Sequence, residues 1–369
     1  MTTEHRLRKF IEYIKSCSAN GGFLASPTYK PYQKVWLRDH SFVTLSLIEY
    51  GVNVDKEICW LTTLLKLESE KVRIIIEKDK GSPDFLNQEL HPRARYSPDF
   101  KKYNDPWSER QYDGIALAYA TVLKYENMKN ERILGEELKL LYDNYFFKVF
   151  DTPCADLWEM HEEYIHAYTL GAIYYALNIR KEQVKHNFLL NVKYSNFLET
   201  LHSEIFKFEK NGVCLKMKKT LRDEPFGLDA SCLLLFTLFD VIKDIDFLET
   251  TLKKIYDELS PDGIGLRRFI INSEKDTYFG GGVWFILNFW AAEAFMKLKN
   301  KKRAQELLQY RFRFPLPEQI IDDHLIFSKE GKKFWIEKSK LENDGIPGPA
   351  EPLTWSNSEF LRVSNHIIL

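Results

Sequence analysis

The chain has 369 residues, of which 44% are hydrophobic and 28% are charged, and its formal net charge is -1. These are ordinary values for a globular protein, so we expect a large core and no extended disorder. The near balance of charge argues against a nucleic-acid or membrane partner bound mainly by electrostatics, because such proteins concentrate positive charge. We expect neither partner.

The cysteines and the N-terminal residues indicate a reducing compartment. The 5 cysteines are odd in number and show no CxxC spacing, which disfavours a disulfide framework and a zinc site. No apolar run follows the first basic residues, and no stretch reaches the roughly 18 uninterrupted apolar residues of a membrane-spanning helix. We expect a soluble, cytoplasmic protein, with a monomer and a homo-oligomer both open.

Helical periodicity recurs from one end of the chain to the other. The predicted helices cover 5–16, 41–50, 56–72, 113–126, 131–147, 163–178, 229–243, 246–258, 283–299 and 301–309. Strand-like alternation is confined to 71–77 and 212–218, and each of these segments fits a short strand or an irregular piece. The pattern predicts an all-α fold with short decorating strands.

Long loops rich in polar and aromatic residues separate these helices. They cover 18–38, 78–112, 148–162, 210–228, 259–282 and 311–353. Helix pairs joined in this way are typical of stacked hairpins that share a core, with the loops gathered at one end. Six hairpins closed into an (α/α)6 barrel fit the length, although periodicity does not distinguish a closed barrel from an open solenoid. Because no Gly-, Ser- or Pro-rich linker divides the chain, one domain over residues 1–369 is expected.

Two glutamates in separate halves of the chain carry the chemical argument. Glu159 ends an Asp-Leu-Trp-Glu string, and Glu318 lies in a Leu-Pro-Glu-Gln string. Hydrolysis of a glycosidic bond uses two carboxyl groups, one protonated to donate to the leaving oxygen and one ionised to activate water. Each glutamate also fits a structural role, Glu159 in an acidic surface loop and Glu318 at a helix start after Pro317.

The surroundings of this pair favour a sugar site. Arg38 and Asp39 follow Trp36, and a charged fork in an aromatic setting can bind vicinal hydroxyls through charge-assisted hydrogen bonds. Sugar rings have apolar faces that stack on aromatic side chains and hydroxyl rims that need oriented partners. The alternative is structural: Arg38 and Asp39 form an ion pair that caps a helix beginning near Ser41.

Six segments in order along nearly the whole chain resemble glycoside hydrolase family 15, the glucoamylase family, in its prokaryotic or archaeal branch. These segments are Tyr32–Asp39, Trp107–Gly114, Asp156–Glu159, Asp276–Trp284, Leu316–Gln319 and Pro352–Ser356. The resemblance implies an (α/α)6 barrel and an inverting, exo-acting hydrolase that releases β-glucose from the non-reducing ends of α-glucans or oligosaccharides. It implies Glu159 as general acid and Glu318 as general base, with the two carboxyl groups about 6.5–9.5 Å apart.

The general acid must stay protonated near neutral pH, and Trp158 beside Glu159 can supply the desolvation that raises a carboxyl pKa. The candidate sugar-binding residues are Tyr32, Trp36, Arg38, Asp39, Trp107, Gln111, Trp158, Arg268 and Trp355. Gln111 also fits a bracing role behind the site, each aromatic residue also fits the core, and Arg267 is the alternative to Arg268. No cofactor or metal is expected, because the 9 histidines show no metal spacing and no phosphate-binding loop is present.

The chain departs from the family pattern at three places, one of which is that Arg267 and Arg268 lie farther before Asp276 than expected for the family's substrate-binding arginine. Met160 stands where many members carry a second acidic residue after the general acid, which leaves the leaving-group subsite open. The chain begins almost directly at the first barrel helix, so we expect a catalytic domain without the N-terminal β-sandwich of prokaryotic relatives. Two alternatives stay open: a trehalase or another α-glucosidase of the same family, and a glucan-binding or regulatory barrel without turnover.

Overall fold

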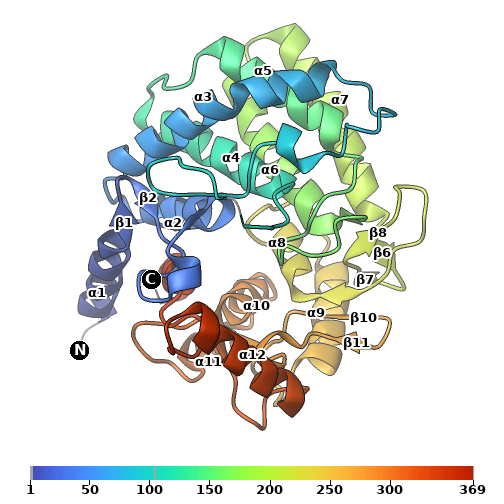
Figure 1. Cartoon of the computed structure of the whole chain (residues 1–369). Coiled ribbons are helices and arrows are strands. Elements are labelled where there is room, and N and C mark those ends of the chain that lie inside the picture. The colour runs from blue at the N-terminus through green and yellow to red at the C-terminus, as the bar shows by residue number, and fades with distance from the viewer. Residues whose placement is uncertain (1–2, 104, 369) are drawn as a thin grey trace.

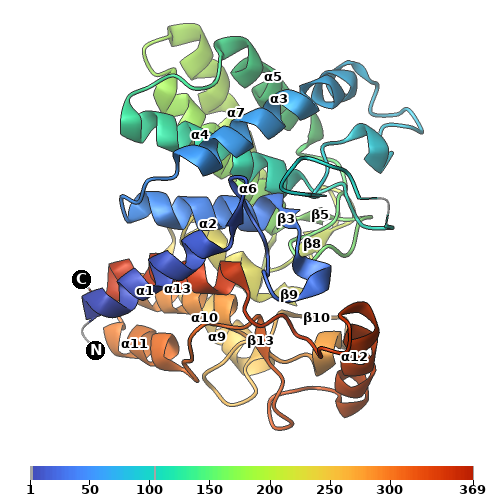
Figure 2. The same ribbon diagram turned by 60° about the vertical axis from the view of Figure 1, so that its left-hand side comes forward.

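The computed structural model describes residues 3–103 and 105–368. Six helices form an inner ring in which each packs against the next and the last packs against the first (Figures 1 and 2). They are α2 (Leu37–Glu49), α4 (Tyr112–Lys129), α6 (Ala167–Gln183), α8 (Leu233–Phe236), α10 (Phe285–Lys297) and α13 (Thr354–Ile368). The contact between α13 and α2 closes the ring, which confirms the predicted (α/α)6 barrel and excludes an open solenoid.

Six further helices alternate with the inner ones along the chain and cover the ring from outside. They are α1 (Thr3–Ser16), α3 (Asp55–Glu77), α5 (Glu136–Val149), α7 (Phe188–Phe206), α9 (Ile245–Leu259) and α11 (Lys301–Gln309). The inner α2 is buried on all sides from Leu37 to Ile48, whereas the outer α9 buries one stripe that includes Leu248, Leu252 and Ile255. The amphipathic pattern of α9 explains its outer position, because such a helix covers a surface with one apolar stripe. Helix α2 also buries polar side chains, including Arg38 and Asp39, so its inner position does not follow from composition alone.

A thirteenth helix among the described residues, α12 (Lys329–Glu342), packs on the short 3-10 turn at Tyr278–Gly280. Figure 2 shows α12 on the same side of the barrel as β3, β5, β8 and β10, with both chain ends on the opposite side. The long loops therefore gather at one mouth of the ring, as expected from their lengths.

The strands are two or three residues long and form small antiparallel pairs within these loops. The pairs are β1 (Ser18–Ala19) with β2 (Gly22–Phe23), β3 (Val35–Trp36) with β4 (Arg95–Tyr96), β5 (Ile165–His166) with β8 (Met217–Lys218), β6 (Glu209–Lys210) with β7 (Val213–Cys214), β9 (Leu228–Asp229) with β10 (Phe269–Ile271), β10 with β11 (Glu274–Lys275), and β12 (Val283–Trp284) with β13 (Gln319–Ile320). Three strands, β3, β5 and β12, run directly into an inner helix, so the pairs hold the loops against the N-terminal ends of the ring.

Several predicted elements need correction. Segment 71–77 is not a strand but the end of α3, because Val72 and Ile75 continue its buried face. The predicted helix at 229–243 is broken: α8 ends at Phe236, and the chain turns at Thr237. Helices α7, α12 and α13 were not predicted. In α7 the buried positions have helical spacing, but exposed apolar residues at its start obscure the pattern.

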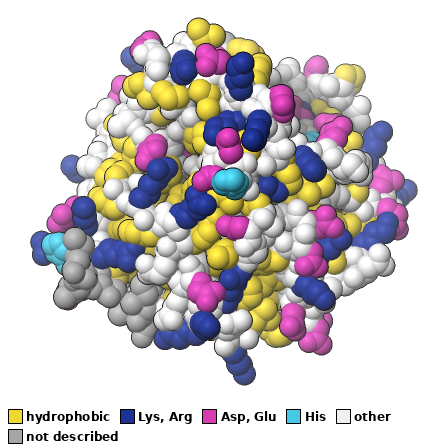
Figure 3. Space-filling view, turned by 90° about the horizontal axis from the view of Figure 1, so that it is seen from below, with side chains coloured by type: hydrophobic (Ala, Val, Ile, Leu, Met, Phe, Trp, Pro, Cys, Tyr) yellow, Lys and Arg dark blue, Asp and Glu magenta, His cyan; other side chains and the backbone are white. Residues whose placement is uncertain are grey.

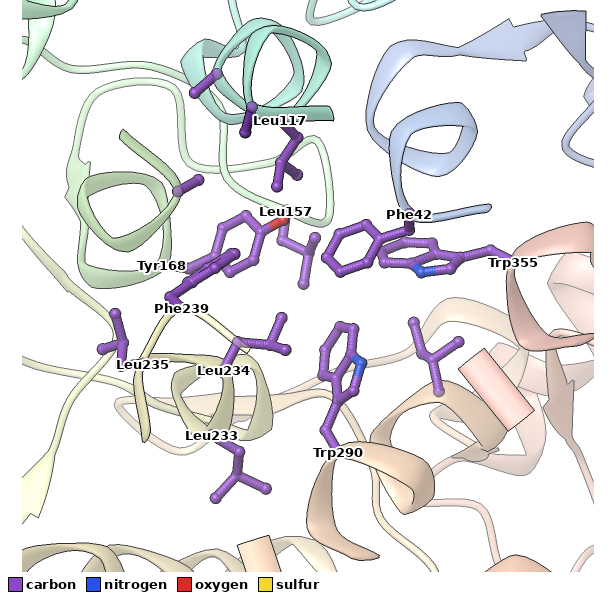
Figure 4. Packing of buried hydrophobic residues seen from close by; sticks show 14 of the residues in the cluster. Phe42, Leu117, Leu157, Tyr168, Leu233, Leu234, Leu235, Phe239, Trp290 and Trp355 are labelled. Carbon is purple, nitrogen blue, oxygen red and sulfur yellow. The ribbon is translucent and has the colours of Figure 1, made fainter. Parts of the chain in front are cut away.

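Side chains fill the centre of the ring (Figure 4). Phe42, Trp290 and Trp355 pack together, with ring centroids 4.9–6.2 Å apart. Leu157 enters this core from the loop between α5 and α6, and Tyr168 lies beside it. The loop that carries Glu159 is therefore anchored in the core immediately before that glutamate.

The outer surface mixes charges of both signs. Figure 3 shows Lys and Arg side chains interspersed with Asp and Glu over the face seen from below. In the part of the chain that the structure describes, no helix combines the length and the apolar character that crossing a bilayer requires.

Candidate active site

A cavity of about 1040 Å³ lies at the mouth of the ring where the N-terminal ends of the inner helices meet the long loops. Small-molecule pockets usually hold roughly 300–1,000 Å³, so this one is large. Both glutamates and nearly all the predicted sugar-binding residues line it: Tyr32, Trp36, Arg38, Asp39, Trp107, Trp158, Glu159, Arg268, Glu318 and Trp355.

Glu318 lies just before β13 and is 3% exposed. Its Oε1 accepts a hydrogen bond from the Tyr32 hydroxyl at 3.0 Å, and its Oε2 accepts one from the Ala350 amide at 3.3 Å. Burial raises the pKa of Glu318 to about 7, and the Tyr32 hydrogen bond and the Arg268 charge only partly oppose this effect. A carboxylate with such a pKa accepts protons readily at neutral pH.

Glu159 lies in the loop between α5 and α6 and is half-buried. Its Oε1 accepts hydrogen bonds from Trp36 Nε1 at 2.7 Å and from Gln111 Nε2 at 3.1 Å. Its backbone φ is +65°, in the left-handed region that residues other than glycine rarely adopt. The surrounding loop must therefore hold this residue in place.

Gln111, predicted among the sugar-binding residues, does not line the cavity. It lies behind the wall, where its amide contacts Glu159 and its carbonyl oxygen accepts from the Arg38 guanidinium. Arg38 Nε in turn donates to Asp113 at 2.6 Å. These contacts match the alternative bracing role, because Gln111 orients the side chains of Glu159 and Arg38 and does not itself face the cavity.

The alternative in which Asp39 caps a helix is wrong. Helix α2 begins at Leu37 with Trp36 as its N-cap, so Asp39 lies within the first turn. Burial raises the pKa of Asp39 to about 7, although the neighbouring Arg38 charge opposes the shift. Arg38 and Asp39 both reach the cavity, with Arg38 paired to Asp113.

Arg268 rather than Arg267 lines the cavity. Its guanidinium forms two hydrogen bonds with the Asp276 carboxylate, at 2.6 and 2.7 Å. Arg267 instead donates to the Leu325 carbonyl oxygen and lies over the Phe327 ring, away from the cavity. The two adjacent arginines, which precede β10, therefore have different surroundings, and only Arg268 faces the cavity.

Aromatic rings form most of the remaining wall. Trp36 and Trp107 meet edge to face at 6.0 Å, and the Arg95 guanidinium lies 4.1 Å from the Trp107 ring centre. Tyr278 and Trp335 are among the wall residues that were not singled out from the sequence. Tyr278 lies in one of the recognised motifs, whereas Trp335 comes from α12, for which no helix was predicted.

The glycine run at 280–282 has a backbone explanation. Gly281 has a φ of +72°, and a Cβ at that position would collide with the Asp276 carbonyl oxygen. The run thus lets the chain fold closely over the residue that holds Arg268. Within residues 3–103 and 105–368, no three His, Cys, Asp or Glu side chains are grouped as metal ligands would be.

Comparisons with known proteins agree with this architecture. The model of glycosyl hydrolases family 15 matches residues 9–314. An isomaltose glucohydrolase of Kribbella flavida is 24% identical over 95% of this chain and 89% of its own length. An uncharacterized glycosyl hydrolase of Methanocaldococcus jannaschii is 25% identical, and the match covers 96% of this chain and 54% of that protein.

Solved structures share the fold. A wild-type glycosidase is 21% identical with a TM-score of 0.79, covering 100% of this chain and 99% of that one. A variant glycosidase in complex with glucose has the same TM-score of 0.79, identity of 21% and coverage of 100% and 99%. A bacterial glucoamylase complexed with acarbose has a TM-score of 0.67 at 15% identity, covering 97% of this chain and 55% of that one. The solved structures show the fold, and the family match shows that the chain belongs to glycoside hydrolase family 15 and is a hydrolase that acts on a sugar substrate.

Proposed function

We propose that the protein is an inverting, exo-acting glucosidase of glucoamylase type that releases β-D-glucose from the non-reducing ends of α-glucans and maltooligosaccharides. The observation that carries this proposal is the position of Glu159 and Glu318, which reach one cavity from separate loops. In this proposal Glu159 is the general acid and Glu318 the general base.

The mechanism follows from what holds each carboxyl group. Glu318 takes a proton from a water molecule as the water oxygen attacks the anomeric carbon. Glu159 gives its proton to the leaving glycosidic oxygen as the bond from that oxygen to the anomeric carbon breaks. Since Trp36 and Gln111 both contact Oε1 of Glu159, the other oxygen is the one assigned to face the leaving group. Attack opposite the leaving group converts an α-linkage to β-glucose.

The depth of the cavity supports action on chain ends. Asp39 and Trp355 are buried at the ends of inner helices, whereas Met160 is 42% exposed at the rim. A terminal glucose would bind between the buried groups, where Arg38, Asp39 and Arg268 offer charged partners for its hydroxyls. The leaving part of the substrate would extend past Met160.

A second candidate is an enzyme with a preference for α-1,6 linkages. It is favoured by the name of the Kribbella flavida relative, an isomaltose glucohydrolase, at 24% identity. It is also compatible with Met160, because that side chain offers the leaving group an apolar surface in place of a carboxylate. Linkage preference depends on this rim rather than on the terminal-glucose site, so the two candidates share one mechanism.

The proposal is tested by sugar release from maltose, isomaltose, trehalose and a dextrin, with the product anomer followed by proton NMR. We expect β-glucose to form first and to mutarotate afterwards, with maltooligosaccharides as the preferred substrates. A preference for isomaltose would select the second candidate, and one for trehalose would select a trehalase. Initial release of α-glucose would contradict inversion, and glucan binding without release would indicate a non-catalytic barrel.

The pH profile tests the role of Glu318. Because burial raises its pKa to about 7 and the base must be ionised, kcat/KM should fall roughly tenfold per pH unit below that value. Tyr32→Phe removes a hydrogen bond that opposes the raised pKa, so the acid limb should move to higher pH. A flat profile from pH 5 to 8, or an unmoved limb in Tyr32→Phe, would contradict this assignment.

A further inference from the structure

A buried lysine lies directly behind the loop that carries Glu159. Lys216 is 3% exposed and is placed between two buried carboxylates, Asp156 and Asp229. Its Nζ lies 2.6 Å from Asp156 Oδ2 and also contacts Asp229 Oδ2. Lys216 does not line the cavity, so any effect on the reaction must pass through its partners.

Both partners of Lys216 also hold the loop on either side of Glu159. Asp156 Oδ1 accepts from the backbone amides of Trp158 at 2.8 Å and Met160 at 2.9 Å. Asp229 Oδ2 accepts from the Trp158 indole nitrogen at 2.8 Å. The residues before and after Glu159 are thus tied to carboxylates that share one lysine.

The lysine is itself firmly placed. Its carbonyl oxygen accepts from the Ala167 amide at the start of α6, at 3.0 Å, and its amide donates to the Gly227 carbonyl oxygen at 2.8 Å. The loop needs such an anchor, since both Glu159 and His161 have positive φ, +65° and +58°. Residues other than glycine are strained in that region, so an unanchored loop would relax to other conformations.

Charge makes the network depend on the lysine. Burial alone would raise the pKa of Asp156, but the Lys216 charge and the His161 hydrogen bond outweigh it and hold this pKa low. Without Lys216, the buried carboxylates of Asp156 and Asp229 would lose their shared cation. Their hydrogen bonds to the loop that carries Glu159 would then change, and so would the geometry of that loop.

We propose that Lys216 is a positioning residue that holds Glu159 in its proton-donating geometry by pairing with Asp156 and Asp229. This inference rests on the proposed role of Glu159 as general acid. Lys216 lies outside all the recognised motifs, and the proposal gives it a specific effect on protonation of the leaving group.

The test compares two substrates that differ in their need for an acid. When a glucose disaccharide is cleaved, the leaving glucose would depart as a strongly basic alkoxide and therefore needs a proton. When α-D-glucosyl fluoride is cleaved, the leaving fluoride is only weakly basic and needs none. Lys216→Met should lower kcat for the preferred disaccharide by about 10²-fold and that for the fluoride by only a few fold. Glu159→Gln should show the same selectivity with a larger loss.

Lys139→Met is the matched control, because Lys139 of α5 is also a buried lysine, paired at 2.7 Å with Glu126 near the C-terminal end of α4, and neither residue lines the cavity. It should change the melting temperature without changing the ratio of the two rates. Lys216→Gln, which keeps a hydrogen-bond donor, is measured in the same way in case Lys216→Met does not fold.

The outcomes separate the two hypotheses. If Glu159→Gln is selective for the disaccharide but the folded Lys216 variant lowers both rates equally or neither, the positioning role is overturned. If Glu159→Gln itself lowers both rates equally, the general-acid assignment fails instead, independently of Lys216. Selective loss in both variants, with an unchanged ratio in Lys139→Met, supports the proposal.

Discussion

Glu318→Gln is expected to lower kcat by about 10²–10⁴-fold and at the same time to stabilise the protein above pH 7. Activity is lost because an amide cannot take the proton from the attacking water. The variant keeps nearly the same shape, so binding of the sugar should persist. Under the proposed assignment, this buried carboxyl group is an example of function maintained at a cost in stability.

The sign of the stability change follows from the pKa. Burial raises the pKa of Glu318 from its ordinary value of 4.5 to about 7. Between these two values the folded state binds more protons than the unfolded state, so its stability falls as pH rises through that window. Glutamine is neutral at every pH and escapes this loss, which amounts to up to about 3 kcal/mol above pH 7.

Thermal unfolding at pH 4 and pH 8, together with sugar release, measures both effects. The melting temperature of Glu318→Gln should exceed that of the wild type at pH 8 and be close to it at pH 4. Glu163→Gln is a suitable control, because Glu163 is exposed and should affect neither property. Wild-type-like turnover, or an equal gain at both pH values, would contradict the assignment.

The second large effect is expected at Arg362 in α13, which is 1% exposed. Its guanidinium pairs with Glu293 of α10 through two hydrogen bonds of 2.9 Å and with Glu359 at 2.9 Å. Trp290 Nε1 also donates to Glu359, at 2.7 Å. This network joins α10 to α13, a contact that the closed ring needs.

Arg362→Met should lower the free energy of unfolding by about 3–5 kcal/mol, because it leaves the fully buried Glu359 without its cation. Urea unfolding measures the change. The double variant Arg362→Met with Glu359→Gln should recover part of the loss, since it removes the orphaned charge. Lys254→Met, which breaks an exposed pair with Glu258, should cost no more than about 1 kcal/mol. A loss in Arg362→Met as small as in this control would mean that the network does not stabilise the ring.

The helices were predictable where their burial is uniform or their stripes are regular, as in α4 and α9. Helix α2 was predicted to start near Ser41 but begins at Leu37. The reason is that Arg38 and Asp39 look like surface residues in the sequence, whereas Asp113 from α4 compensates the Arg38 charge inside the fold. A pairing partner far along the chain leaves no periodic signal near the residue it compensates.

The residues of the site could likewise be predicted only in part from the sequence. The residue types needed for glycoside hydrolysis could be recognised because the motifs are short and local. Three features could not be predicted: Gln111 lies behind the wall, Trp335 reaches the cavity from α12, and Lys216 pairs with Asp156 behind the loop that carries Glu159. Each of these depends on where a separate segment of the chain packs.

The helical class, the order of the motifs and the two glutamates within them could be predicted from the sequence, because these are properties of neighbouring residues. Three features followed only from the folded chain: the ring closes, Arg268 rather than Arg267 reaches the cavity, and Glu318 has a pKa of about 7. Side-chain direction and pKa depend on burial and on charges brought from distant segments, and those neighbours exist only once the chain has folded.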